Sequence, residues 1–409
     1  NADNLLLSGS ALINMNIATS GAFVTTADLT WGNGFLTKFN TTGQRLWTTY
    51  IANGPNYAHI KDCAVNSNND IYLVGVTGGG QGTSQSDALA TSGSHKEHCD
   101  FFYSEAFIVK FDSNGLRLWG TFFGGGYSDT ITTIALDTAE NLIIGGYTRS
   151  SDQIATPGSF QDTNPIGSRA VFYEAGFFSK FTAAGNQLYG SYFNKGIDNS
   201  AVDSDNNIYF TGQYTIDSDY PNIATSNAFQ QTCNGTDIFL TKFNSSFTQQ
   251  WCTYYGGTET TTAFNNSDRS SAVCTDNNDD IYLIGTTSSP NNIASSGSFK
   301  DALAPGKVNS FVAKFDGSGN RIWGTYYGPQ DSNTADTCES GSINKATGEV
   351  YIIGNTRNTA YYGGATSFQP SNRGSDECFI SKINTSGSPI WSTYYGTPSQ
   401  DYSSSIFYK

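Results

Sequence analysis

Hydrophobic and polar positions alternate along short stretches of this chain, as half-buried β-strands require. In FVAKFD, residues 311–316, the two phenylalanines and the alanine fall on one face of an extended chain, and the valine, lysine and aspartate fall on the other. After the polar turn residues 317–320, the stretch RIWGTYY is again rich in aromatic and β-branched residues. The pattern predicts two antiparallel strands joined by a tight turn.

This strand–turn–strand unit occurs six times, at intervals of 62–72 residues. A second unit of the same kind lies between successive copies, for example VCTDNNDDIYLIGTT at residues 273–287. Each repeat therefore predicts four strands, which we call A and B (the second unit) and C and D (the first). The chain opens with DNLLLSGS, which aligns with strand B, and closes with YSSSIFYK, which aligns with strand A.

Six four-stranded repeats with a split first unit predict an all-β, six-bladed β-propeller of antiparallel strands. In this prediction the C-terminal strand joins the N-terminal blade, so that three strands from one end and one from the other close the ring and remove its free sheet edges. A linear solenoid is the alternative, but it needs polar caps. A single domain, residues 1–409, is expected to hold blade 1 at 4–51 with strand 402–408, and blades 2 to 6 at 58–123, 130–193, 198–255, 269–327 and 337–395.

A further motif lies between strands B and C and carries a resemblance to a known family. It reads NIATSGAF (16–23), QIATPGSFQ (153–161), NIATSNAFQ (222–230) and NIASSGSFK (292–300). With the strand C and D pattern, it resembles the SBBP family of β-propeller repeats. The chain departs from that pattern at Phe247, where the turn glycine is expected, and at YYGGATSFQP, 361–370. The resemblance implies a large exported or cell-surface protein, often of Bacteroidota, such as an adhesion-like protein, type 9 secretion cargo, or a partner of the secretion and gliding machinery.

Composition limits the function classes. Of the 409 residues, 14% are charged and 14% are aromatic, and the net charge of −14 supplies no basic patch for a nucleic acid. No run of 18 apolar residues is present, so the sequence predicts no membrane-spanning segment. A low-charge chain rich in Asn, Thr and Tyr favours an extracellular or cell-surface location.

A lysine recurs in the middle of strand C, although lysine is depleted in strands. We interpret it as a structural residue, whose apolar stem packs in the blade while the ammonium pairs with a residue two positions on, a backbone carbonyl or an acid of a neighbouring strand. The alternative is a sixfold ring of cations around a pore, but strand C would be third from the axis. The six residues are Lys38, Lys110, Lys180, Lys242, Lys314 and Lys382.

The most unusual connection is 78–105, which holds two of the three histidines. His95, His98 and Cys99 are candidate metal ligands there. The cysteines offer a competing interpretation, because they fall in pairs within blades 2, 4 and 6 and leave Cys274 as a buried thiol. Such pairing would imply an oxidising compartment and would remove Cys99 as a ligand. The candidate disulfides are Cys63–Cys99, Cys233–Cys252 and Cys338–Cys378.

No catalytic motif and no cofactor motif is found, so no catalytic residue is assigned. The turns 203–207 and 276–280 resemble calcium loops only faintly, because neither has the full ligand spacing. Asp129, Asp198 and Asp401 recur near the entry to strand A, which favours a structural role.

The B–C connections are long and differ between blades, and loops of that kind usually carry binding function. We therefore expect a non-catalytic binding or adhesion propeller that recognises a protein or a glycan through its B–C loops. The alternative is a carbohydrate-active enzyme, a lyase or glycosidase, with its site at the channel mouth.

Overall fold

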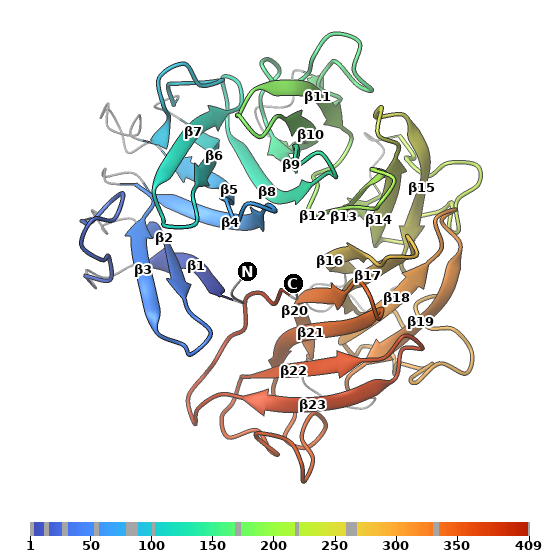
Figure 1. Cartoon of the computed structure of the whole chain (residues 1–409). Helices are drawn as coiled ribbons and strands as arrows, with labels where there is room; N and C mark the ends of the chain where they lie inside the picture. Colours follow the sequence, from blue (N-terminus) through green and yellow to red (C-terminus); the bar gives the residue numbers. More distant parts are fainter. Residues whose placement is uncertain are drawn as a thin grey trace. The chain divides into compact units, whose positions relative to one another are not determined.

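The computed structural model describes residues 4–11, 16–26, 32–52, 57–78, 89–99, 103–167, 173–216, 221–258, 268–329 and 335–407. Every regular element in these residues is a β-strand, numbered β1 to β23 along the chain (Figure 1). The prediction of an all-β fold built from four-stranded antiparallel sheets is confirmed. The chain divides into two compact units, Asn1–Ile197 and Asp198–Lys409, where a single domain was expected.

The first unit holds blades 1 to 3. Its strands are β1 (Leu5–Ala11), β2 (Asn33–Phe39), β3 (Arg45–Tyr50), β4 (Ala58–Val65), β5 (Ile71–Gly78), β6 (Ser104–Phe111), β7 (Arg117–Phe123), β8 (Asp129–Leu136), β9 (Leu142–Thr148), β10 (Ala175–Phe181) and β11 (Gln187–Phe193). Strands β8–β11 form a four-stranded sheet. Blades 1 and 2 count as one seven-stranded sheet, because a parallel bridge between Asn33 and Ala58 joins them.

The second unit holds blades 4 to 6, each a four-stranded sheet. Blade 4 contains β12 (Asn199–Val202), β13 (Ile208–Thr215), β14 (Thr236–Phe243) and β15 (Gln249–Tyr255). Blade 5 contains β16 (Arg269–Thr275), β17 (Ile281–Thr287), β18 (Asn309–Phe315) and β19 (Arg321–Tyr327). Blade 6 contains β20 (Thr337–Asn344), β21 (Glu349–Thr356), β22 (Glu377–Ile383) and β23 (Pro389–Tyr395).

Blade 1 contributes three strands to the first unit, and register shows which strand it lacks. Leu5 of β1 pairs with Phe39 of β2, as Ile281 of strand B pairs with Phe315 of strand C in blade 5. Strands β1, β2 and β3 are therefore B, C and D. The expected C-terminal strand at 402–408 is not formed over its described part, since residues 402–407 have no strand assignment. Ring closure therefore stays a proposal.

The C-terminal segment nevertheless lies where a further A strand would begin in the second unit. The amide of Ser403 donates to the side chain of Asn355 on β21 at 2.7 Å. The amide of Cys338 on β20 donates in the same way to the side chain of Thr286 on β17, at 2.9 Å. The segment thus repeats against blade 6 a contact that blade 6 makes against blade 5.

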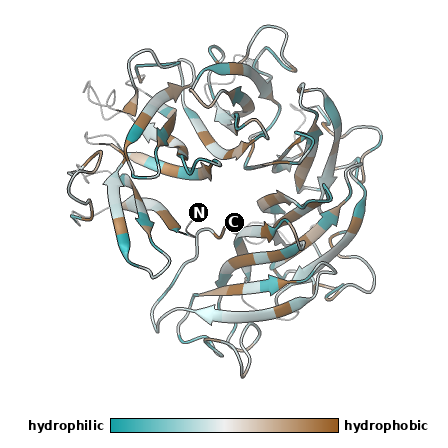
Figure 2. Ribbon diagram, in the orientation of Figure 1, coloured by the Kyte–Doolittle hydropathy of each residue, from teal (hydrophilic) through white to brown (hydrophobic). Residues whose placement is uncertain are grey.

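Large aromatic side chains fill the spaces between blades. Hydrophobic positions are spaced along the strands, with hydrophilic residues between them and in the turns (Figure 2). In blades 2 and 5, strand B is buried along its whole length, as β5 and β17 show. Because both faces of these two strands are covered, their sequences are nearly continuous apolar runs, whereas strand D, as in β19, begins with partly exposed residues and ends buried.

A tryptophan on strand D connects each blade to the C–D turn of the next within a unit. The indole Nε1 of Trp47 donates to the carbonyl of Ser113 at 3.3 Å, and that of Trp251 donates to Gly317 at 3.2 Å. The ring lies against the turn glycine, so that a Cβ added at Gly115 would come within 2.8 Å of Trp47. Gly115 also has a φ of 82°, which side-chain-bearing residues rarely adopt. Trp119 and Trp323 make the same contact with Ala183 and Thr385.

Candidate functional site

The six repeat lysines all occupy the penultimate position of strand C. Two of them, Lys38 and Lys242, donate to the backbone carbonyls of Ser113 and Gly317 at 2.8 and 3.1 Å. The other four form ion pairs of 2.8–2.9 Å with an acid in or beside the A–B turn of their own blade: Lys110–Asp70, Lys180–Asp137, Lys314–Asp280 and Lys382–Glu349.

Lys314 shows how such a lysine is held. Its ammonium lies 2.8 Å from Asp280, 3.4 Å from Asp276 and 5.0 Å from the centre of the Tyr282 ring. Burial lowers the pKa of Lys314, but the hydrogen bonds to Asp280 and Tyr282 outweigh it and raise the pKa above its ordinary value. The acid two positions on, Asp316, accepts turn amides instead, including that of Ser318 at 2.9 Å. The structural role of Lys314 stays a prediction, with its test given below.

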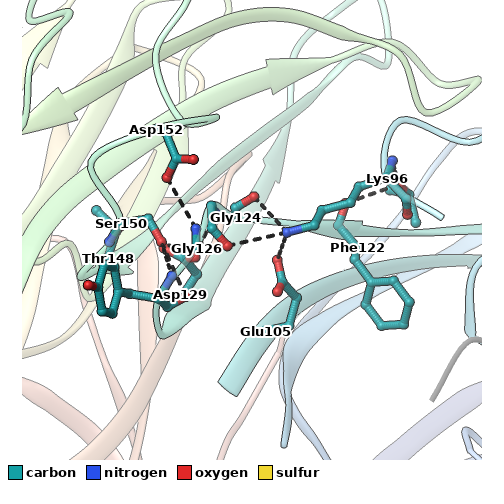
Figure 3. A network of polar contacts seen from close by, with 12 residues as sticks. Lys96, Glu105, Phe122, Gly124, Gly126, Asp129, Thr148, Ser150 and Asp152 are labelled. Atoms are coloured by element: carbon teal, nitrogen blue, oxygen red, sulfur yellow. Dashed lines mark hydrogen bonds and ion pairs between the residues drawn. The ribbon is translucent and has the colours of Figure 1, made fainter. Parts of the chain in front are cut away.

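In blades 2, 4 and 6, the Lys or Gln that ends the motif between strands B and C contacts an acid at the start of strand C. In blade 2, the Lys96 ammonium lies 2.7 Å from Glu105 and 2.9 Å from the carbonyl of Gly124, which follows strand D (Figure 3). The Glu105 carboxylate is fully buried. A buried carboxylate must be paired, and Lys96 supplies the pairing charge.

Blades 4 and 6, both in the second unit, use glutamine for the same contact. The side-chain amide of Gln230 donates to Asp237 at 2.7 Å, and that of Gln369 donates to Glu377. Asp237 and Glu377 open strand C and are fully buried, as Glu105 is. In these three blades the motif is therefore part of the scaffold, and its last residue pairs with a buried acid.

His95 takes the aromatic position of this motif, so it is not assembled with His98 and Cys99 into a metal site. Residues 89–96 read LATSGSHK and contain the same motif, which the sequence analysis missed because His replaces Phe. The His95 ring lies 5.3 Å from Phe181 edge-on and 6.2 Å from Phe123. Burial of the ring lowers the pKa of His95, and the charge of Lys96 lowers it further. Among the described residues, no group of three His, Cys, Asp or Glu side chains could hold a metal ion.

The predicted disulfides Cys63–Cys99, Cys233–Cys252 and Cys338–Cys378 are not formed, since the structure records all seven cysteines as thiols. For the third pair, strand order gives the reason. Cys338 of β20 and Cys378 of β22 flank the intervening strand β21. Two strand spacings of about 4.8 Å exceed the reach of a disulfide. The Cys233 thiol contacts the Tyr214 carbonyl at 3.4 Å, and burial raises the pKa of the Cys63 thiol to about 12.

The recurring entry aspartates hold the junction between blades. Asp129 accepts the Ser150 hydroxyl at 2.8 Å and the Gly125 amide at 2.9 Å (Figure 3). Burial raises the pKa of Asp129 to about 6, although those hydrogen bonds act in the opposite direction. Asp336 occupies the same position in blade 6, and burial raises its pKa to about 7.

Two other entry aspartates named from the sequence are also tied to their surroundings. The backbone amide of Asp198 donates to the Thr211 carbonyl at 2.7 Å. Asp401 accepts the Thr397 amide at 2.6 Å. The entry position is therefore part of the scaffold.

The turns that resembled calcium loops use their carboxylates within the protein. Asp203 accepts the amides of Asp205 and Asn207 at 3.0 and 2.7 Å. Asp276 accepts the amides of Asn278 and Asp280 in the same pattern, at 2.9 and 3.1 Å. These are Asx-type hairpin turns in which the carboxylate caps the loop.

The second unit contains a pocket of about 560 Å³ at the rim that carries the B–C connections. This rim is where strand A begins, strand B ends and strand C begins. The lining is dominated by charged and hydrogen-bonding side chains, and it draws on blades 5 and 6 and the C-terminal segment. Its residues are Arg269, Ala335, Thr337, Glu339, Asn355, Arg357, Asp376, Tyr402 and Ser403.

An arginine–aspartate pair forms one side of the pocket. Nε and Nη2 of Arg357 donate to the two carboxylate oxygens of Asp376 at 2.6 and 3.0 Å, a bidentate geometry. The Arg357 hydrogen bonds hold the pKa of Asp376 below its usual range. On another side, Arg269 lies 3.8 Å from Glu339.

The C-terminal segment borders the pocket and is held there by hydrogen bonds. Gln400 donates to Asp376 at 3.1 Å, and both the amide and the hydroxyl of Ser403 donate to Asn355, at 2.7 and 3.0 Å. These contacts place the Tyr402 ring at the pocket, with 67% of the residue exposed.

Blade 3 carries a related pair at the same repeat positions. Arg149 directly follows strand B and Glu174 directly precedes strand C, as Arg357 and Asp376 do in blade 6. The Arg149 guanidinium lies 3.3 Å from Glu174, with one nitrogen in contact, and both side chains are partly exposed.

These pocket residues are not among those predicted from the sequence, although the sequence contains a usable signal. In blades 2, 4 and 5 the two positions that flank the B–C connection are uncharged: Gly78 and Ser104, Thr215 and Thr236, and Ser288 and Val308. An Arg–acid pair at those positions therefore stands out against the repeat, which is how it could have been found.

Repeated four-stranded antiparallel sheets, with successive A strands packed together inside each unit, define the β-propeller class. No protein-family model matches the chain. A stretch of 169 residues, 39% of the chain, is 28% identical to an uncharacterized WD repeat-containing protein of Acanthamoeba polyphaga mimivirus, and it spans 12% of that protein.

Solved structures give similarities of arrangement only. An ulvan lyase of a polysaccharide lyase family is 9% identical, with 98% of this chain and 85% of that chain covered and a TM-score of 0.40. A quinonprotein alcohol dehydrogenase-like protein from Bacteroides thetaiotaomicron is 9% identical, covering 97% and 92%, with a TM-score of 0.35. BamB from Moraxella catarrhalis is 13% identical, covering 78% and 75%, with a TM-score of 0.29. At these scores the similarities carry no information about activity.

Proposed function

We propose that this chain is a non-catalytic, exported binding propeller that recognises a glycan or a protein through the face of its B–C connections. The pocket of about 560 Å³ in the second unit carries the proposal. It has the size of ordinary ligand pockets, and polar groups converge in it. It also lies at the rim where the blades differ most.

The state of the pocket acid favours binding over glycoside hydrolysis. A general acid needs a pKa near the working pH, and glycosidases raise one carboxyl group for that purpose. Asp376 has the opposite shift, because Arg357 holds it ionised. A fixed carboxylate of this kind accepts hydrogen bonds from a ligand and keeps its charge.

Ring closure forms part of the proposal. The docked C-terminal segment supports it, because Ser403 makes the contact that an A strand makes in the preceding blade. Strand β1 supports it from the other end, since it is the first strand of a three-stranded blade and its residues Leu5 and Leu7 are 63% and 49% exposed. A six-bladed ring, with the strand at 402–408 added to blade 1, would cover Leu5 and Leu7.

The proposed export rests on composition and on the SBBP resemblance, which also suggests type 9 secretion cargo or a partner of the secretion or gliding machinery. Among the described residues, no helix has the length and apolarity needed to cross a bilayer. Surface proteolysis of intact source cells tests this part, and protection of the protein until lysis would contradict it.

The binding proposal is tested with the whole chain and two readouts. Immobilised cell-surface polysaccharides and purified surface proteins should show saturable binding that the double variant Arg357→Ala, Asp376→Ala loses. The same polysaccharides should give no new reducing ends and no unsaturated products after long incubation. Product formation that the double variant abolishes would show instead a carbohydrate-active enzyme.

A further inference from the structure

We propose that the pocket of the second unit takes a neutral oligosaccharide and that the C-terminal segment forms its aromatic wall. This inference rests on the proposed binding function and names the ligand class of the same site.

Charge balance in the pocket selects a neutral ligand. Its lining holds two arginines, Arg269 and Arg357, and two acids, Glu339 and Asp376. The Arg357 fork, which would otherwise grip a carboxylate or sulfate, is already occupied through Nε and Nη2 by Asp376. A net charge of −14 on the chain further opposes polyanions. Uronates and sulfated sugars should therefore bind less tightly than neutral sugars.

The hydrogen-bonding groups of the lining include both donors and acceptors. Carboxylates accept only, guanidinium groups donate only, and the amide of Asn355 and the hydroxyl of Thr337 add mixed capacity. A sugar hydroxyl donates and accepts at once, so neighbouring hydroxyls on one ring can satisfy an acid and an arginine together. Asp376 and Arg357 are held in one orientation by their bidentate pair, which reduces the entropy lost on binding.

Tyr402 supplies the apolar surface that a sugar ring requires. Its side chain is largely exposed at the pocket, and aromatic side chains combined with a few placed polar groups are typical of such sites. Tyr402 lies between Gln400 and Ser403, which fasten the segment to Asp376 and Asn355. Sugar binding and docking of the C-terminal segment should therefore support each other.

The experiment measures binding of the full-length protein to arrays of neutral gluco-, manno-, galacto- and xylo-oligosaccharides, with uronate and sulfated arrays in parallel. At least one neutral series should bind, and binding should weaken about tenfold in Tyr402→Ala and in Asp376→Asn, as expected for loss of about one strong contact each. Tyr402→Phe should retain binding, because it keeps the ring.

The matched control is Arg149→Met in blade 3, which removes the related pair at residues that do not line this pocket and should leave binding unchanged. Tighter binding to uronate or sulfated arrays would overturn the inference, as would neutral binding that is insensitive to Tyr402→Ala and Asp376→Asn. Saturable binding of a surface protein with no sugar bound would also overturn it while leaving the proposed function standing. Conversion of a bound sugar would overturn the proposed function itself.

Discussion

Two pairs of opposite charge at the starts of C strands have different surroundings. Lys96 and Glu105 in the first unit have side chains that are 15% and 0% exposed, and Gly124 completes the contacts of the ammonium. Arg357 and Asp376 in the second unit have side chains that are 58% and 12% exposed and line a pocket. The first pair is almost wholly covered by protein, and the second is open to solvent on the arginine side. The difference teaches that exposure, rather than the presence of a charge pair, separates scaffold from site.

The largest effect is expected at the closed pair. Lys96→Met would leave the buried Glu105 carboxylate uncompensated, which typically costs about 3–5 kcal/mol of unfolding free energy. Lys96→Gln should cost less, because Gln230 and Gln369 make the equivalent contact with a buried acid. Denaturant unfolding measures both variants. A Met variant as stable as the parent would show that the pair is not part of the scaffold.

The next effect is expected at the strand C lysine. Lys314→Met removes the cation shared by Asp276 and Asp280 and should cost about 1–3 kcal/mol, because Asp276 stays buried with fewer partners. Ligand binding should not change. Thermal unfolding measures the loss of stability, and the oligosaccharide array measures ligand binding. Lost binding at an unchanged melting temperature would assign Lys314 to a site.

An effect of similar size distinguishes the buried entry aspartates from the pocket acid by its dependence on pH. Asp129 and Asp336 have raised pKa values of about 6 and about 7, so the folded protein binds protons more tightly than the unfolded chain. Their contribution is therefore most favourable near pH 4 and is lost as pH rises through 6 to 7, by roughly 1–3 kcal/mol in total.

Melting temperatures at pH 5 and 8 measure this loss, and Asp336→Asn should flatten the slope between them. Asp376 stays ionised across the same window, because Arg357 lowers its pKa, so ligand affinity should hardly change. An unchanged slope in Asp336→Asn would contradict the assignment of the pH dependence to that carboxyl group.

The smallest stability effect is expected at the open pair. Arg357→Met and Arg149→Met each break an ion pair whose arginine is reached by solvent and should change the unfolding free energy little, because solvent screens such pairs. Only Arg357→Met should weaken ligand binding. Equal losses of binding in both variants would remove the distinction between blade 6 and blade 3.

Local periodicity made most of the fold predictable from the sequence. Alternation over six or seven residues fixed the strands, and the polar turns fixed their boundaries. The B–C motif of blade 2 was missed because His95 occupies the phenylalanine position. Histidine fits the packing there, but it does not match the residue pattern of the motif. Strand order ruled out Cys338–Cys378, and spacing along the chain does not report strand order.

The pocket could not be predicted as a unit, because its residues are distant in sequence. Arg269, Arg357 and Tyr402 come from a blade start, a strand end and the C-terminal segment. Their proximity follows from how blades 5 and 6 pack, and no local pattern encodes that packing. Their individual positions at strand ends were visible, and the charge at those positions was the clue.

The strand D tryptophan that donates to the next C–D turn gives the repeat a direction. Trp47 reaches Ser113 and Trp251 reaches Gly317, and each receiving blade carries the turn that the donor needs. One blade-length of gene therefore encodes both a donor for the following copy and an acceptor for the preceding copy. Tandem duplication or loss of such a segment would keep junctions of this kind matched without new interface residues.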